Sequence, residues 1–301
     1  MPDGSTRLEP ILRDLTAKSE SYTFFDSRGL LYATQFAQPA ILLMEKAAFE
    51  DMKANGLIQE GAAFAGHSLG EYGVLASLVD FLPFEMMMSV VFYRGLVMQF
   101  TMERDSNGHT GFSMVAVSPK RVGKCKFCSS FDQLSQAHGE TDFDEAMLRI
   151  VVDLIHRQSG KLLEIVNFNV EAEQYVCAGH LVASLRSASD PAITDVAKEI
   201  AVYLEKAPQL NNPTELKRGR ATIPLQGIDV PFHSSHLRSG VSVYRRFLEE
   251  RIQAENVQVD RLVGKFIPNV MGKPFAIDRS YLEEAAAVTG SSVLRELALA
   301  A

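Results

Sequence analysis

The apolar residues of this chain recur in two different patterns, which together predict an α/β protein. Apolar residues three and four positions apart are typical of amphipathic helices, and short unbroken apolar runs between turn residues are typical of buried strands. The first pattern predicts helices over residues 35–55, 83–102, 144–157, 190–206, 237–253 and 281–300. The second predicts strands at residues 62–65, 111–117, 162–169, 174–178, 221–225 and 266–270.

The middle of the chain has a different order of elements from its two ends. From residue 111 to residue 221 the order is strand, helix, two strands, helix and strand, which is the ferredoxin-like arrangement. We therefore expect residues 111–221 to form a small inserted subdomain of this kind. The larger domain is then discontinuous and consists of residues 1–110 and 222–301.

One turn between a strand and a helix carries the strongest chemical signal. The motif Gly66-His67-Ser68-Leu69-Gly70 matches the Gly-X-Ser-X-Gly nucleophile elbow, which exposes a serine at the end of a strand in a hydrolase-like parallel sheet. The backbones of Gly66 and Gly70 are expected to pass close together, so that neither residue tolerates a side chain. We predict Ser68 as the nucleophile and the backbone N–H of Leu69 as an oxyanion donor. A purely structural turn is the alternative interpretation.

Arg94 is the next candidate, because it closely follows a nearly unbroken apolar run at residues 86–92 of an expected helix. A guanidinium among apolar residues requires an anion, either from the protein or from a ligand. Within the protein, Glu71 and Glu103 are the candidate partners, unless the side chain reaches water along its aliphatic stem. The residues alone leave these possibilities open.

Composition and charge exclude several classes of function. The chain has 301 residues, of which 47% are apolar, and this is ample for a buried core. The formal net charge of -7 comes without a basic stripe, so we expect no nucleic-acid partner. No apolar stretch approaches the length of a membrane span, and the N-terminal residues do not resemble a secretory signal. We expect a cytoplasmic protein without a membrane partner.

Three cysteines are too few for a disulfide framework in a chain of this length. Cys125 and Cys128 form a Cys-x-x-Cys pair, a pattern found in redox pairs and in zinc half-sites. Cys177 is the one further thiol, and no second pair follows. We therefore expect Cys125 and Cys128 to be surface-loop residues, and we expect no metal site.

Two histidines compete for the role of the base that a nucleophilic serine needs. His233 and His236 both lie between an expected strand and the helix over residues 237–253, on a loop from which a base often acts. The residues alone do not separate them. Asp195 and Asp229 stand between the serine and these histidines in chain order, as in a hydrolase triad, but neither has the sequence context of a triad acid.

Five further motifs accompany the elbow in a fixed order. They are ATQFAQPA at residues 33–40, FYRGL at 92–96, EIVNFNVE at 164–171, VPFHS at 230–234 and KFIPN at 265–269. With GHSLGEY at 66–72, they resemble the malonyl/palmitoyl transferase domain of the fungal fatty acid synthase β subunit, within the malonyl-CoA:acyl-carrier-protein transferase family. The resemblance extends over about residues 22–297.

This resemblance implies the acyltransferase fold and acyl transfer between coenzyme A and an acyl carrier protein, through an ester on Ser68. It selects His233 as the base, with His236 in the first turn of the following helix, and it implies that Arg94 binds the free carboxylate of malonyl. Further polar residues expected near the site, each with a turn or strand-edge cap as its alternative role, are His67, Asn167, Asn169 and Asn269.

The resemblance also predicts what the chain binds. No cofactor is expected to be held permanently, because coenzyme A thioesters are substrates and the phosphopantetheine belongs to the carrier protein. The expected partners are the acyl carrier protein on the α subunit of the synthase and the other domains of the β subunit.

The sequence departs from the family near both ends. The family has a Gly-Gln-Gly turn after its first strand, where the glutamine helps to form the oxyanion hole, and no Gly-Gln-Gly occurs here. The family's last strand and its glycine-rich turn are missing too. We therefore expect a chain truncated at both ends. Two alternatives to an active transferase stay open, namely an inactive or assembly-only fragment and a serine hydrolase or thioesterase.

Overall fold

A computed structural model describes residues 12, 14–26, 28–78, 82–105, 108, 110–122, 124–125, 141–180, 221–253 and 258–301. The chain divides into two compact units. The first unit comprises Met1–Gln99 and Ser242–Ala301, and the second comprises Phe100–Val241. The predicted division at residues 111 and 221 stays a prediction.

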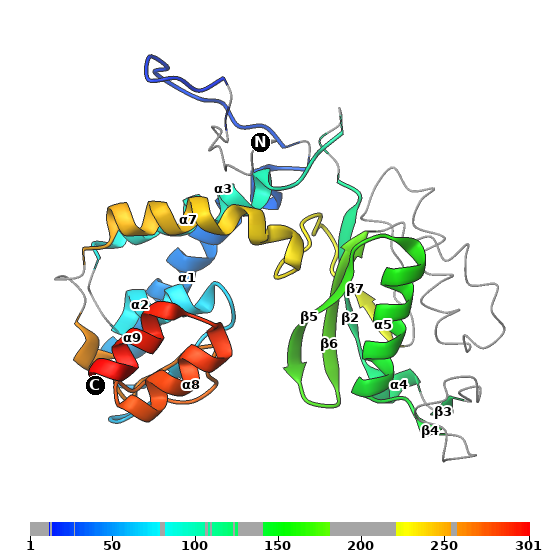
Figure 1. The fold of residues 1–301 in the computed structure, drawn as a ribbon. Helices are drawn as coiled ribbons and strands as arrows, with labels where there is room; N and C mark the ends of the chain where they lie inside the picture. Colours follow the sequence, from blue (N-terminus) through cyan, green and yellow to red (C-terminus); the bar gives the residue numbers. More distant parts are fainter. Residues whose placement is uncertain are drawn as a thin grey trace. The chain divides into compact units, whose positions relative to one another are not determined.

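The described part of the first unit combines helices with a small sheet (Figure 1). Its helices are α1 (Thr34–Ala54), α2 (Gly70–Leu78), α3 (Phe84–Phe100), most of α7 (Arg238–Arg251), α8 (Arg279–Thr289) and α9 (Ser292–Ala300), with short 3-10 helices η1 (Leu30–Tyr32) and η6 (Val259–Arg261). The helices predicted over residues 35–55, 83–102 and 281–300 are thereby confirmed as α1, α3 and the pair α8 and α9.

The sheet of the first unit is parallel and short. Strand β1 (Phe64–Ala65) pairs with β8 (Phe266–Ile267), two segments about 200 residues apart in the sequence. The predicted strand over residues 266–270 is therefore too long. Pro268 follows β8 directly and has no N–H with which to continue the hydrogen bonding of the ladder.

The core of the first unit lies among α1, α2 and α3. Leu42 of α1 and Val91 of α3 are completely buried, and burial of such a side chain contributes about 1.5–3 kcal/mol. Phe266 of β8 belongs to the same apolar cluster. Since α3 is apolar around most of its circumference, it needs neighbours on more than one side. The core thereby fixes the strand and the helix that flank the elbow.

A four-stranded antiparallel sheet forms the centre of the second unit in its described part. The strands lie in the order β5 (Leu163–Val170), β6 (Gln174–His180), β2 (Phe112–Val117) and β7 (Thr222–Pro224). The other elements are α5 (Glu145–Ser159), α4 (Pro119–Val122), a hairpin of β3 (Lys124–Cys125) with β4 (Thr141–Asp142), and the 3-10 helix η4 (Ser235–Leu237).

Alternate residues of the central strands cover the two faces of this sheet. Val117 faces α5, together with Leu148 of that helix, whereas Ala116 belongs to a separate cluster on the other face. The partly buried ring of Phe232 packs against this second cluster. Figure 1 shows α5 lying along one face only. The other face therefore receives the segment that contains His233.

Parts of the sequence prediction fall on residues that the structure does not describe. The predicted helix over residues 190–206, and Asp195 within it, lie outside the described residues, as does Cys128. Elements β2, α5, β5 and β6 follow one another as predicted, except that α4, β3 and β4 lie between β2 and α5. The expectation that Cys125 is a loop residue is wrong, because Cys125 pairs with Thr141 in the hairpin.

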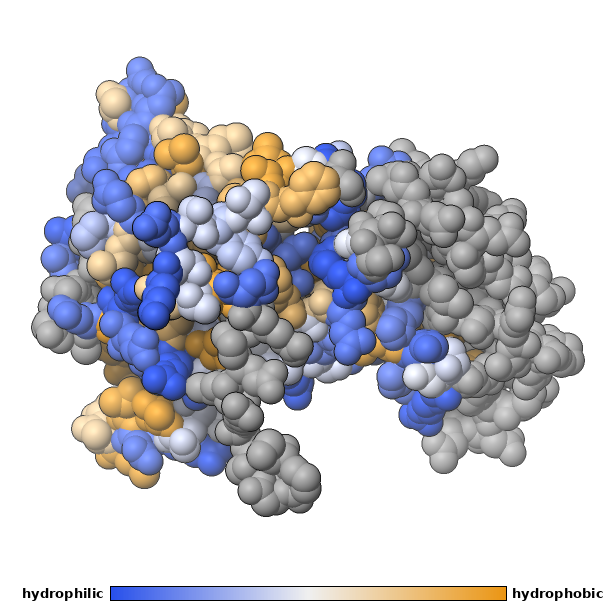
Figure 2. All heavy atoms as spheres, turned by 90° about the horizontal axis from the view of Figure 1, so that it is seen from above, coloured by the Kyte–Doolittle hydropathy of each residue, from blue (hydrophilic) through white to orange (hydrophobic). Residues whose placement is uncertain are grey.

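Large apolar side chains also reach the surface. Met44 of α1 is 65% exposed and Leu299 of α9 is 75% exposed. Figure 2 shows hydrophobic side chains gathered in patches among hydrophilic ones. Contiguous exposed apolar surface is typical of regions that contact other proteins. None of the helices within the described ranges is long and apolar enough to cross a membrane.

Candidate active site

The elbow holds Ser68 in a left-handed backbone conformation, with φ of 54°. A Cβ atom on Gly66 would lie 2.1 Å from the backbone of Gly70, so only glycine fits at position 66. A Cβ atom on Gly70 would meet no atom within 4 Å. The expectation that both glycines must lack a side chain is therefore confirmed for Gly66 and wrong for Gly70.

The side chain of Asn269 binds the backbone of the elbow at Ser68 and at Gly66, two residues before it. Its Oδ1 accepts a hydrogen bond from the Ser68 N–H at 2.9 Å, and its Nδ2 donates to the Gly66 carbonyl at 2.6 Å. The Asn269 N–H in turn donates to a carboxylate oxygen of Glu71 at 2.8 Å. One amide side chain thus fixes the turn in a conformation that serine rarely adopts.

Arg94 reaches the nucleophile directly. Its Nη2 donates to the Ser68 Oγ at 2.9 Å, and its Nη1 donates to the Gln38 Oε1 at 2.7 Å. The guanidinium carbon lies 5.3 Å from the centre of the Tyr72 ring, as in a cation–π contact. Among the described residues Arg94 forms no ion pair, so the expected alternatives of pairing with Glu71 or Glu103 are wrong. A full positive charge therefore stands at the serine hydroxyl.

Gln38, which was not among the predicted site residues, holds the guanidinium. The side chain of Gln38 is buried, and its Nε2 donates to the Thr34 Oγ1 at 2.9 Å. The Thr34 N–H donates to the buried Gln99 Oε1 at 3.3 Å. Polar residues four positions apart on the buried side of a helix are the signal that could have found this network.

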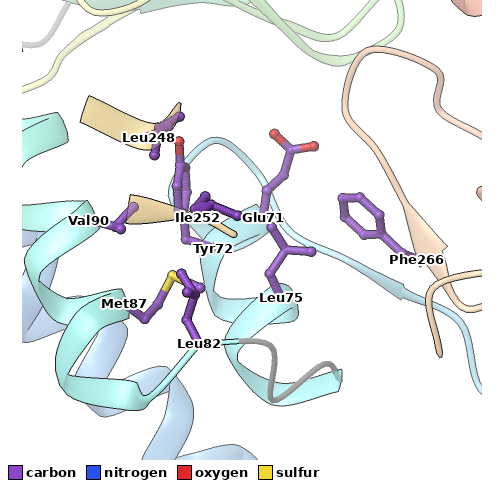
Figure 3. A pocket seen from close by; sticks show the side chains of 9 residues that line it. All are labelled: Glu71, Tyr72, Leu75, Leu82, Met87, Val90, Leu248, Ile252 and Phe266. Atoms are coloured by element: carbon purple, nitrogen blue, oxygen red, sulfur yellow. The ribbon is translucent and has the colours of Figure 1, made fainter. Parts of the chain in front are cut away.

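An apolar pocket of about 240 Å³ lies beside the elbow helix (Figure 3). It is lined by Glu71, Tyr72, Leu75, Leu82, Met87, Val90, Leu248, Ile252 and Phe266. The Tyr72 ring contributes to its wall and also lies against Arg94. The hydroxyl of Tyr244 donates to that of Tyr72 at 3.0 Å. Burial raises the pKa of Tyr244, with a further contribution from Tyr72. Near the elbow the pocket therefore has mainly apolar walls, to which the Tyr72 ring belongs.

His233 belongs to the second unit and also has a left-handed backbone, with φ of 63°. The next residue, Ser234, is buried, and its Oγ donates to the Pro231 carbonyl at 2.7 Å, which closes a tight turn around the histidine. His236 lies in η4, just before α7, and its ring is 5.1 Å from the ring of Phe112. The two histidines therefore differ in backbone conformation, and His233 has the unusual one.

Asp229 does not have the environment of a triad acid. Its carboxylate is buried and receives two hydrogen bonds from Arg104, at 2.7 and 3.2 Å. A buried, two-pronged ion pair of this kind has a structural role, because removal of one partner leaves the other charge uncompensated. The geometry therefore weakens the hydrolase alternative.

The remaining candidates stay predictions. Asn167 and Asn169 lie in β5, and the Nδ2 of Asn169 donates to the Gln174 Oε1 at 3.4 Å, across the end of a strand pair. His67 is an exposed residue of the elbow. The Leu69 N–H donates no hydrogen bond to any described residue, as an oxyanion donor requires before substrate binds.

The structure is thus an α/β protein with a serine at a tight turn between a strand and a helix. Residues 7–293 match the family model described as "Acyl transferase domain", so the chain belongs to the acyl transferase domain family. The acyltransferase fold expected from the sequence is thereby confirmed.

Individual relatives agree with this assignment. The chain is similar to the fatty acid synthase subunit beta of Aspergillus oryzae, with 88% identity over all of this chain and 15% of the relative. It is also similar to the fatty acid synthase subunit beta of Saccharomyces cerevisiae, with 40% identity over 98% of this chain and 15% of the relative. The chain thus spans about 15% of the length of these curated relatives.

A solved structure shares the fold. FabD from Acinetobacter baumannii superposes with a TM-score of 0.54 at 18% identity, over 90% of this chain and 69% of that structure. At this level of identity the likeness concerns the fold alone.

Proposed function

We propose that this chain transfers malonyl and palmitoyl groups between coenzyme A and the phosphopantetheine of an acyl carrier protein, through an ester on Ser68. The main support is the 2.9 Å hydrogen bond from Arg94 to the Ser68 Oγ. A guanidinium at the nucleophile attracts an acyl group that ends in a carboxylate, because its planar fork matches two carboxylate oxygens. Membership of the acyl transferase domain family agrees with this chemistry.

In the loading step, His233 takes the proton of Ser68 as the Oγ attacks the thioester carbonyl carbon. The carbonyl electron pair moves onto the oxygen, where the Leu69 N–H donates to it. When the tetrahedral intermediate collapses, the carbon–sulfur bond breaks and His233 returns the proton to the sulfur of coenzyme A. The carrier thiol then loses its proton to His233, attacks the ester and releases Ser68 in its protonated form.

The two acyl groups are proposed to use different neighbours of Ser68. The malonyl carboxylate binds Arg94 in place of the serine hydroxyl contact. The apolar pocket beside Tyr72 is suited to part of a long acyl chain, because its walls are mainly aliphatic. His67, Asn167, Asn169 and Asn269 remain proposed polar residues of the site, Asn269 through its bonds to the elbow backbone.

The proposal includes the partners. The carrier protein with the synthase α subunit, and the other β-subunit domains, are the partners we infer, because the curated relatives are fatty acid synthase β subunits. Exposed apolar side chains such as Met44 and Leu299 suit contacts with further domains. We place the activity in the cytoplasm, in keeping with only three cysteines in the chain.

The test is covalent loading of Ser68. The full chain is incubated with malonyl-CoA or palmitoyl-CoA, and its intact mass is measured. The measurement is repeated with a β subunit of Aspergillus oryzae in which this chain replaces the matching segment. We expect one acyl group per chain and none in Ser68→Ala. The matched control is Ser77→Ala, a serine of α2, the helix that follows the elbow, and this variant should load like the unsubstituted chain.

Other outcomes separate the alternatives. An adduct that persists in Ser68→Ala moves the nucleophile to another residue. Release of free acid, without transfer to the carrier thiol, identifies a hydrolase. Absence of loading in both contexts identifies the inactive or assembly-only fragment.

A further inference from the structure

A carboxylate from the sheet of the second unit binds the loop that carries His233. Glu164 accepts a hydrogen bond from the Ser235 N–H at 2.8 Å through Oε2, and its Oε1 accepts another from the Ser235 Oγ. Ser235 is two residues beyond His233. The carboxylate therefore binds the loop immediately after the turn in which the histidine adopts its left-handed backbone.

Glu164 is itself firmly placed. It lies in β5 opposite Ala178 of β6, a completely buried residue, so its backbone is part of the sheet ladder. The ladder has a register shift just after this point, between Ile165 and Asn167. Bulges of this kind re-aim side chains and are frequent near functional sites. The neighbouring Val166 packs with Phe232 on the face of the sheet opposite α5.

The two ends of the histidine turn are thus held by different means. On the N-terminal side, Val230 and Pro231 are buried and Phe232 packs against the sheet. On the C-terminal side, Ser235 is exposed, and the carboxylate of Glu164 binds it. A charge-assisted pair of hydrogen bonds restricts a loop more strongly than neutral ones.

We propose that Glu164 is a positioning residue of the transfer reaction, which sets the orientation of His233 by clamping Ser235 to β5. The proposal rests on the proposed function, in which His233 is the base of both half-reactions. In this role Glu164 acts through Ser235 and His233. Its contribution is geometric, and a displacement of about 1 Å in a catalytic group lowers rates on the order of 100-fold.

The test compares variants of the full chain by the rate of Ser68 loading from malonyl-CoA and from palmitoyl-CoA. Glu164→Ala removes both bonds and should slow loading by both substrates equally, by about 100-fold. Glu164→Gln keeps the shape of the side chain but offers a single acceptor oxygen for the two donors. Its loading rate should therefore lie between those of Glu164→Ala and the unsubstituted chain. The control is Glu173→Ala, a carboxylate near the same strand pair that binds the exposed Lys120 and should leave the rate unchanged.

A double substitution distinguishes positioning from general damage to the fold. If Glu164 acts through His233, then Glu164→Ala should have no further effect in the His233→Ala background, with or without added imidazole as a replacement base. If Glu164→Ala slows that background by the same factor, or leaves the unsubstituted chain unaffected, the positioning role is overturned. Melting temperatures of all variants identify any that fail to fold. If Glu164→Ala does not fold, Glu164→Gln takes its place in the comparison.

The same set separates this inference from the proposed function. Unchanged loading in His233→Ala, or a greater loss in His236→Ala, contradicts the choice of base and thus the proposed function. If His233→Ala loses Ser68 loading while Glu164→Ala keeps the full loading rate, only the positioning role is contradicted.

Discussion

Three described residues other than glycine have a positive φ, namely Ser68, Ala172 and His233. Two of them are the residues proposed as nucleophile and base. A non-glycine residue in this region costs about 1–3 kcal/mol and persists only where its surroundings fix it. Asn269 fixes Ser68 through the backbone of Gly66 and of Ser68 itself, and Glu164 fixes the segment after His233. The strain and its support therefore occur together at both positions.

Replacement of Arg94 by alanine should separate the two substrates. Malonyl transfer should lose about 2–5 kcal/mol of transition-state stabilisation, the scale for truncating one partner of a buried charge pair. Palmitoyl transfer should change little or improve, because this acyl group has no carboxylate to bind. The measurement is kcat/KM for both substrates with the same variant. Arg94→Lys keeps the charge without the fork and should retain part of the malonyl activity. Equal losses for both substrates would falsify the carboxylate role.

The sequence predicted the residues whose motif or environment is unusual, but not the residues that hold them. Ser68 stands in a turn motif and Arg94 beside an apolar run, so both were singled out. Gln38 and Glu164 are ordinary polar residues in a helix and a strand. Their importance depends on which distant side chains the fold brings to them, and a single sequence contains no record of those pairings.

At the scale of elements, long periodic segments were predictable and short ones were not. Helix α1 was predicted to within one residue at each end, because its apolar spacing extends over several turns. The two-residue pair β3 and β4 was missed, since such short strands show no period. The apolar pattern predicts too long a strand for β8, because it does not take into account the hydrogen-bonding capacity of Pro268 and Asn269.

The elbow should tolerate alanine at one of its glycines only. Gly66→Ala places a Cβ atom 2.1 Å from the backbone of Gly70, which forces β1 and α2 apart. We expect this variant to lose Ser68 loading and to melt at a lower temperature. The matched variant Gly70→Ala meets open space and should keep both properties. Equal behaviour of the two variants would show that the close approach at Gly66 is not required.

Helix α1 carries two glutamates that should respond oppositely to pH. Burial raises the pKa of Glu45, whose Oε2 has no hydrogen-bond partner among the described residues. The stability that the protonated form of Glu45 contributes is fully present below the pKa that this group has in the unfolded chain. It is lost as the pH rises through the pKa of the group in the folded chain. Glu45→Gln should therefore raise the melting temperature at pH 7 relative to the unsubstituted chain, and this advantage should disappear near pH 4.

Glu50 on the same helix is the control, because its pKa is shifted in the opposite direction. A hydrogen bond from Lys46, together with its charge, lowers the pKa of Glu50. Its contribution is present above the unfolded pKa and is lost as pH falls through the folded value. Glu50→Gln should therefore give no stabilisation at pH 7. Thermal melts of both variants from pH 4 to pH 8 make the comparison, and a stabilised Glu50→Gln would contradict the assignment.

At the scale of the whole chain, each unit has apolar clusters of its own. The cluster that contains Leu42 and Val91 draws its residues from the first unit, and the cluster around Leu148 and Tyr175 draws them from the second. Local stability follows local packing, so separate cores allow separate opening. The change in element order along the sequence predicts a division into two parts, which stays a prediction. The bounds of the observed units depend on where contacts between segments end, and the order of elements does not contain this information.

The buried thiol of Cys177 can report opening of the second unit. Burial raises the pKa of Cys177 to about 12, so at pH 8 only about one thiol in ten thousand is a reactive thiolate in the closed unit. An opened chain has an ordinary cysteine pKa of about 8.5 and is labelled readily. The rate at which a thiol reagent modifies Cys177, read from peptide masses so that the other two cysteines do not interfere, therefore measures how often this core opens.

Two equivalent core substitutions then test whether the units open separately. Leu148 in the second unit and Leu42 in the first are both completely buried, and replacement of either by alanine should cost about 2–5 kcal/mol. Leu148→Ala should speed the labelling of Cys177 by about 30-fold or more, since each 1.36 kcal/mol is a factor of ten. Leu42→Ala should leave that rate unchanged. If both variants speed labelling equally, the two units open as one cooperative body.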